Sequence, residues 1–116
     1  MKKTLYGIPN CDTVKKARTW LADHAQSVEF HDFKKQGLER ATAANWLDQL
    51  DWEVLVNRKG TTWRKLPEER KAAITGKGAA LELMLEFPSL IKRPVLEGAG
   101  PLNVGFSDAQ YRQIFP

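Results

Sequence analysis

The chain has 116 residues, of which 42% are hydrophobic, and this length is typical of one domain with a single modest core. We therefore expect a single domain, residues 1–116. The net charge of +4 favours anionic partners, whereas one cysteine excludes an internal disulfide and two histidines provide no cluster with the spacing of a metal site.

No segment has the composition of a membrane span or an export signal. The N-terminus carries two lysines without a sustained apolar stretch, and no later run approaches the roughly 18 apolar residues that cross a bilayer. We expect a cytoplasmic protein without membrane contact. So mild a positive charge does not by itself predict direct nucleic acid binding.

The N-terminal part predicts a βαβ unit. Residues 4–8 are typical of a strand, and apolar residues from Val14 to Leu21 then recur at helical spacing through about residue 24. Residues 28–33 combine β-branched and aromatic side chains with alternating polar ones, which predicts a second strand. Because a helix joins the two strands, we expect them to be parallel.

The middle of the chain is predicted to be helical. Apolar residues at helical spacing predict helices over residues 38–50 and 51–56, and a polar segment containing glycine predicts a loop over 57–62. Acidic residues directly after a proline predict a helix starting near 66–69. A last helix is predicted over 79–87, and it ends at Pro88.

The C-terminal part predicts a hairpin followed by a helix. Residues 94–97 and 102–106 are typical of strands, and they flank the glycine-rich turn 98–101. Ser107 followed by Gln110 three residues later matches a capping box, which predicts a final helix from this point.

The order βαβ, helical insertion, ββα predicts an α/β protein of thioredoxin-like fold, with the insertion between its two halves. In this fold the end of the first strand faces the start of the third. We therefore expect Cys11 to lie near Arg93 and Pro94, and we predict that the Arg93–Pro94 peptide bond is cis.

Cys11 is the first candidate functional residue because it lies between the first strand and the first helix. Free backbone N–H groups and the helix dipole favour a thiolate at such a position, as do Lys15 and Lys16 one turn later. Asp12 or Thr13 could cap the helix, although the carboxylate of Asp12 disfavours a second negative charge. The alternative is a buried structural thiol.

A reactive Cys11 would depend on an outside thiol. Val14 occupies the position of the second cysteine in a Cys-x-x-Cys pair, so a dithiol cycle within the chain is excluded. Cys11 would attack a disulfide or an oxyanion, and a small thiol such as glutathione would resolve the product. We expect glutathione as a co-substrate and no bound cofactor.

Three arginines are candidates for binding an anionic substrate. Arg58 lies in a polar loop and Arg93 directly precedes Pro94, and both are expected near the strand ends around Cys11. Guanidinium groups bind oxyanions with a fixed fork of donors and lower the pKa of a nearby thiol. Arg64 is a weaker candidate that could instead pair with Glu68 or Glu69. The alternative for each is a solvated surface arginine.

Four segments resemble the arsenate reductase-like ArsC family, which includes the Spx regulators and the YffB-type reductases. The segments are YGIPNCDT (residues 6–13), LVNR (55–58), TTWRKL (61–66) and FPSLIKRP (87–94). The resemblance spans essentially the whole chain, and it is strongest to the YffB type.

The resemblance implies that Cys11 is the nucleophile and that Arg58 and Arg93 grip an oxyanion. The arsenate reductases of the family have a histidine where this chain has Gly7, and a third arginine where it has Gly105 and Phe106. We therefore expect poor arsenate reduction. The resemblance implies a glutathione-dependent thiol/disulfide reductase, with glutaredoxin as a further candidate partner. The alternative is an Spx-like regulator that binds RNA polymerase without catalysis.

Overall fold

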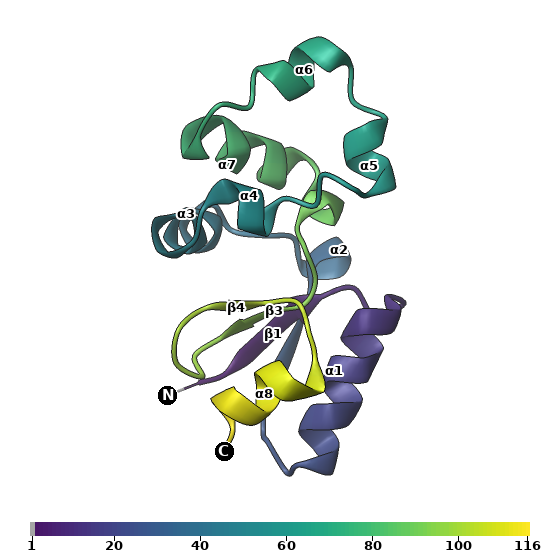
Figure 1. Ribbon diagram of the computed structural model, residues 1–116, viewed down its shortest axis with the longest axis vertical. Coiled ribbons are helices and arrows are strands. Elements are labelled where there is room, and N and C mark those ends of the chain that lie inside the picture. The colour runs from purple at the N-terminus through teal and green to yellow at the C-terminus, as the bar shows by residue number, and fades with distance from the viewer. Residues whose placement is uncertain (1) are drawn as a thin grey trace. The chain divides into compact units, whose positions relative to one another are not determined.

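The computed structural model describes residues 2–116, and the chain forms two compact units (Figure 1). One, here called the sheet unit, contains the chain up to Gln36 together with Arg93–Pro116. The other, here called the helical unit, is Gly37–Lys92. The helical unit is thus inserted between two halves of the sheet unit, as predicted.

The sheet unit contains four strands: β1 (Thr4–Gly7), β2 (Glu29–Asp32), β3 (Val95–Glu97) and β4 (Asn103–Val104). Their order in the sheet is β2-β1-β3-β4. β1 is parallel to β2 and antiparallel to β3, and β3 is antiparallel to β4. The predicted parallel pair, the C-terminal hairpin and the thioredoxin-like fold are confirmed.

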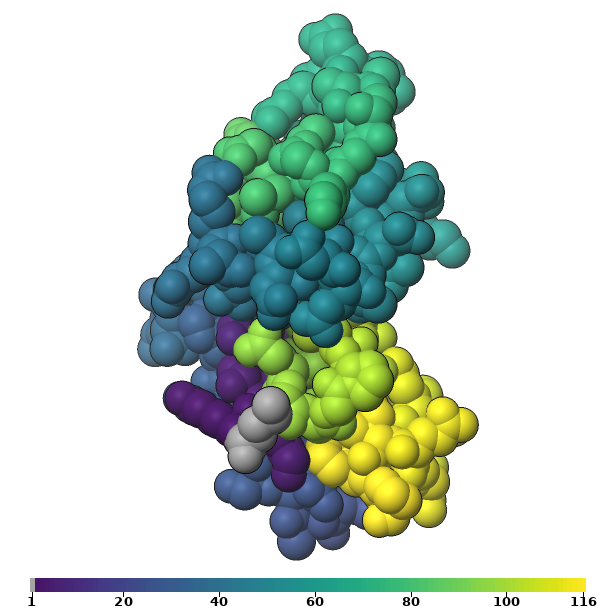
Figure 2. Space-filling model, turned by 90° about the vertical axis from the view of Figure 1, so that its left-hand side faces the viewer, coloured from purple at the N-terminus to yellow at the C-terminus, as the bar shows by residue number. Residues whose placement is uncertain are grey.

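Helices α1 (Asp12–Asp23) and α8 (Asp108–Ile114) pack on one face of this sheet (Figure 1). In the turned view of Figure 2, α8 lies beside the β3–β4 hairpin. The shared core is apolar and contains Leu5, Ala17, Trp20, Leu21, Leu96 and Tyr111. Burial of these side chains supplies the main free energy that holds α1 against the sheet.

The predicted capping box at α8 forms only in part. The Ser107 hydroxyl oxygen accepts a hydrogen bond from the Gln110 backbone N–H at 3.1 Å, as expected. The Gln110 side chain, however, donates to the Asn103 side-chain oxygen at 2.5 Å and to the Val104 carbonyl at 3.2 Å. The Gln110 side chain therefore bonds to β4 instead of forming the reciprocal capping bond. These bonds connect α8 to the sheet.

The second predicted strand is too long at its C-terminal end. β2 ends at Asp32, and the short helix α2 (Phe33–Gln36) follows at once. The Asp32 carboxylate accepts from the Lys34 backbone N–H at 2.9 Å, and the Gln36 side chain accepts from the Asp32 N–H at 3.0 Å. These local side-chain bonds favour a helical turn over continued strand pairing.

The helical unit consists of α3 (Arg40–Gln49), α4 (Trp52–Leu55), α5 (Thr61–Arg64), α6 (Glu68–Ala72), α7 (Lys77–Glu86) and the 3₁₀ turn η1 (Pro88–Leu90). The prediction of a loop over residues 57–62 is wrong at its end, because α5 begins at Thr61. The hydroxyls of Thr62 and Ser89 lie 3.2 Å apart, and Trp63 packs against a core of Leu66, Leu83 and Leu90. Tertiary contacts thus stabilise a turn that local propensity does not predict.

Two segments of the helical unit pair like short strands. The Asn57 N–H donates to the Leu90 carbonyl, and the Lys92 N–H donates to the Leu55 carbonyl, both at 2.7 Å. This pairing fixes the backbone immediately before Arg58. Within residues 2–116, no helix combines the length and apolar character of a bilayer span.

Gly7 allows α1 to approach the end of β1 closely. A Cβ atom at this position would lie 2.8 Å from Cγ2 of Val14, which is closer than a van der Waals contact. Val14 is fully buried and β-branched, so its side chain has little freedom to move away. Any side chain at position 7 therefore pushes against α1.

We expect Gly7→Ala to destabilise the protein by about 1–3 kcal/mol, the usual cost of an overpacked contact. Urea unfolding measures the change. Gly78→Ala is the matched control, because Gly78 lies within α7 and an added Cβ there meets no atom within 4 Å. That variant should be more stable by about 0.5–1 kcal/mol. A Gly7→Ala protein as stable as wild type would contradict the close contact.

Candidate active site

The strand register brings the start of β3 to the end of β1. Tyr6 pairs with Val95, so Arg93 and Pro94 lie just beyond the last residues of β1. The chain leaves β1 through a turn in which the Cys11 N–H donates to the Ile8 carbonyl at 3.2 Å. The Arg93–Pro94 bond is cis, which confirms the prediction.

Cys11 itself occupies the N-cap position of α1, and no side-chain oxygen caps this helix. The predicted cap by Asp12 or Thr13 is therefore wrong. The backbone N–H groups of Thr13 and Val14 instead lie close enough to the Cys11 sulfur to lower the pKa of its thiol. The sulfur takes the place that a serine or aspartate oxygen has at an ordinary N-cap.

The surroundings of Cys11 lower the pKa of its thiol. Partial burial acts in the opposite direction, since it disfavours the charged form, but it is outweighed by the hydrogen bonds from the N–H groups of Val14 and Thr13 and by the hydrogen bond and positive charge of Arg93. The thiol is only partly buried, so a substrate can reach it. Cys11 thus combines accessibility with a stabilised thiolate.

Arg93 contributes to this site in two ways. Its guanidinium lies close enough to the sulfur for both its N–H donors and its positive charge to lower the pKa of the thiol. A guanidinium has five N–H donors, so one group can contact both the sulfur and an anion bound beside it. The arrangement suits nucleophilic attack on a group that carries negative charge.

Arg58 and Arg64 lie in the helical unit. Arg58 forms an ion pair with Glu53 at 2.9 Å, and its guanidinium carbon lies 5.5 Å from the centre of the Trp52 ring. Arg64 is an exposed residue of α5, and Glu68 pairs with Lys71 at 3.2 Å rather than with Arg64. The structure thus brings Cys11 and Arg93 together, whereas the roles of Arg58 and Arg64 stay predictions.

The sequence predicted that backbone N–H groups would favour the thiolate, but it did not show that those of Thr13 and Val14 do so, because backbone groups leave no motif. The available signal was the position of Cys11 itself, directly before a helix. Among residues 2–116, no three side chains of His, Cys, Asp or Glu come together as metal ligands.

Comparisons with known proteins agree on one family. A model of the ArsC family matches residues 6–114. A solved structure of a protein named YFFB is 46% identical, with a TM-score of 0.93, and the match covers 99% of this chain and 100% of that one. A solution structure of an arsenate reductase (ArsC) related protein from Brucella melitensis is 53% identical, with a TM-score of 0.78, and the match covers 99% of this chain and 95% of that one.

A regulator is also among the relatives. The global transcriptional regulator Spx of Streptococcus agalactiae is 26% identical over 115 residues, which are 97% of this chain and 82% of that protein. Relatives that match nearly the whole of this chain thus include a protein named for its relation to arsenate reductase and a longer one named for transcriptional regulation.

We expect Arg93→Met to raise the pKa of the Cys11 thiol, because the variant loses both the hydrogen bond and the charge. The rate of alkylation by iodoacetamide follows the thiolate fraction. The pH at which the alkylation rate is half-maximal should therefore rise in Arg93→Met. It should rise by less in Arg93→Lys, which keeps the charge. Arg112→Met is the matched control, since Arg112 is an exposed residue of the same unit that pairs with Asp108. Equal midpoints in wild type and Arg93→Met would contradict this contribution of Arg93.

Proposed function

The chain belongs to the ArsC family, and on that premise we propose that it is a glutathione-dependent thiol/disulfide reductase with Cys11 as its only nucleophile. The observation that supports this proposal best is the thiolate site itself: two backbone N–H groups and Arg93 converge on one accessible sulfur. Because the sequence has no second cysteine, the thiol that completes the reaction comes from outside the chain.

In the first step the Cys11 thiolate attacks one sulfur of a substrate disulfide. A bond forms between Cys11 and that sulfur, the substrate S–S bond breaks, and the other half leaves as a thiolate that takes a proton from water. Arg93 holds the attacking sulfur as its anion and is close enough to bind negative charge on the substrate.

In the second step two glutathione thiolates restore the enzyme. The first attacks the mixed disulfide, releases the substrate thiol and leaves glutathione bonded to Cys11. The second attacks that bond, forms oxidised glutathione and frees the Cys11 thiolate. One disulfide is thereby reduced to two thiols while two glutathione molecules are oxidised to one disulfide. Glutaredoxin is a further candidate for the resolving thiol.

Arsenate is a poor substrate in this proposal. The close approach of Gly7 to Val14 leaves no room for a histidine at that position. Gly105 has a φ of +84°, a conformation that favours glycine, and the ring of Phe106 lies 4.7 Å from that of Tyr111. These observations support weak binding of a tetrahedral oxyanion, because the histidine and the third arginine of the family's arsenate reductases are missing at these positions.

Arg58 takes the second anion-binding role in this proposal, and Arg64 a lesser one, both by resemblance to the family. Arg58 would exchange Glu53 for the substrate anion. This exchange costs little, because an exposed ion pair contributes only about 0–1 kcal/mol.

The test is reduction of the mixed disulfide of glutathione and mercaptoethanol, followed by the oxidation of glutathione. We expect wild type to turn over with glutathione and Cys11→Ser to lose this turnover. Arg93→Ala should lower kcat/KM by about 10- to 150-fold, which corresponds to about 1.5–3 kcal/mol for a charge-assisted hydrogen bond. Arg112→Ala should keep wild-type kinetics, and arsenate should be reduced far more slowly.

Two outcomes would overturn the proposal. Wild-type kinetics in Arg93→Ala would remove Arg93 from the anion-binding role. A wild-type protein that shows no glutathione-dependent turnover but is retained by RNA polymerase would instead support the regulatory function of its Spx-type relatives.

A further inference from the structure

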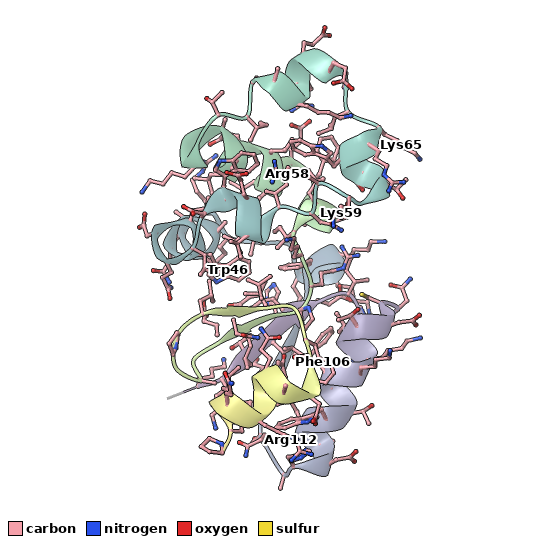
Figure 3. All side chains as sticks on the ribbon, viewed as in Figure 1. Trp46, Arg58, Lys59, Lys65, Phe106 and Arg112 are labelled. Atoms are coloured by element: carbon pink, nitrogen blue, oxygen red, sulfur yellow. The ribbon has the colours of Figure 1, made fainter. Side chains whose placement is uncertain are left out.

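A groove on the flank of α1 has no part in the chemistry above. It is open to solvent, has a volume of about 330 Å³, and is lined by Lys15, Lys16, Thr19, Trp20, Asp23 and Phe106. All of these residues belong to the sheet unit. Figure 3 shows Phe106 between α8 and α1, where it forms one wall.

Both walls of the groove connect through the backbone to the surroundings of the reactive cysteine. On one side, Lys15 lies one helical turn after Cys11, and its N–H donates to the Cys11 carbonyl at 2.9 Å. On the other side, Phe106 follows Gly105, whose N–H donates to the Pro94 carbonyl at 2.8 Å. A chain attached to the Cys11 sulfur therefore has this groove open to it within one turn of α1.

The lining of the groove changes along its length. Lys15 and Lys16 are exposed near Cys11, and neither forms an ion pair within the part of the chain that the structure describes. The aromatic wall of Trp20 and Phe106 follows, held by the hydrogen bond from Trp20 Nε1 to Asp108 at 2.7 Å. The carboxylate of Asp23 lies at the far end. The order from Cys11 is cationic, apolar, anionic.

The length of the groove exceeds the reach of glutathione. With a rise of about 1.5 Å per residue, the two lysines lie roughly 6–8 Å along α1 from Cys11, and Asp23 lies about 18 Å away. An extended peptide advances about 3.3 Å per residue, so about two residues reach the lysines and about five reach Asp23. Glutathione has one residue on each side of its cysteine and ends near the lysines.

From this geometry we propose that the groove binds the polypeptide next to the substrate cysteine, so that the substrate is a protein or peptide disulfide. The matching segment is extended, with an acidic residue about two positions from its cysteine, an apolar residue about four positions away, and a basic residue opposite Asp23. This inference rests on the proposed thiol chemistry of Cys11 and names the class of substrate that it serves.

The test measures the equilibrium in which Cys11 displaces glutathione from a peptide–glutathione disulfide, which releases reduced glutathione and forms a disulfide between Cys11 and the peptide. Mass spectrometry counts the adduct, and no turnover is needed. Two synthetic peptides with cysteine at one end are compared, one with glutamate and one with lysine two positions away.

We expect wild type to favour the acidic peptide about 3- to 10-fold, as two exposed charge contacts would give, and to lose this preference at high salt. The double variant Lys15→Ala/Lys16→Ala should lose the preference, and Lys15→Arg/Lys16→Arg should keep it. Lys34→Ala/Lys35→Ala is the matched control, because it removes two exposed lysines from α2 of the same unit. Lys15 and Lys16 were expected to favour the thiolate, but they are not among the groups that shift the pKa of Cys11 in the structure. Iodoacetamide rates should therefore be alike in these variants.

Equal adduct formation with both peptides in wild type would overturn the assignment of the groove. So would a loss of the acidic-peptide preference in Lys34→Ala/Lys35→Ala as large as that in Lys15→Ala/Lys16→Ala. If the small glutathione disulfide is turned over without a peptide preference, the groove inference fails and the proposed function stands. If the acidic peptide is preferred but no glutathione-dependent turnover occurs, the proposed reductase activity fails and the groove assignment stands.

Discussion

Cys11 occupies the N-cap position of α1, where a side-chain oxygen ordinarily caps a helix, and the backbone N–H groups of Val14 and Thr13 help to lower the pKa of its thiol. A neutral thiol is a weak acceptor, whereas a thiolate accepts strongly, so the helix N-terminus favours ionisation of the residue that caps it. The rest of the sheet unit maintains this contact. Gly7 lets α1 begin close to β1, and the antiparallel register of β1 and β3 brings the charge of Arg93 to the same atom.

A single cysteine with a lowered thiol pKa restricts the chemistry that the site can perform. In the proposed reaction Cys11 forms a mixed disulfide that the chain cannot resolve itself, so selectivity would depend on which two outside thiols reach the sulfur. Arg93 acts on charge within contact of the sulfur, whereas the groove along α1 acts on residues farther along a bound chain. In the proposed reaction, Arg93 would therefore activate Cys11 and the groove would select its substrate.

The fold was predictable from sequence because its main elements carry strong local signals. Apolar periodicity identified α1 and the longer helices, and the turn glycines Gly98 and Gly100, both with positive φ, identified the hairpin. The helix α5 was missed because it depends on contacts with distant residues, such as that between Thr62 and Ser89, and α2 was missed because local side-chain bonds of Asp32 and Gln36 end the strand pattern early. At the site, Cys11 and Arg93 followed from their place in the fold, whereas the pairing of Arg58 with Glu53 depends on side-chain positions that sequence alone does not give.

The measurement that tests this account most directly is a titration of the ultraviolet absorbance of the thiolate. Because Cys11 is the only cysteine, the difference between wild type and Cys11→Ser reports on this one group. The account predicts a lower midpoint in the folded protein than in the same chain unfolded in urea. A folded midpoint equal to or above the unfolded one would contradict the stabilised thiolate on which the proposed chemistry depends.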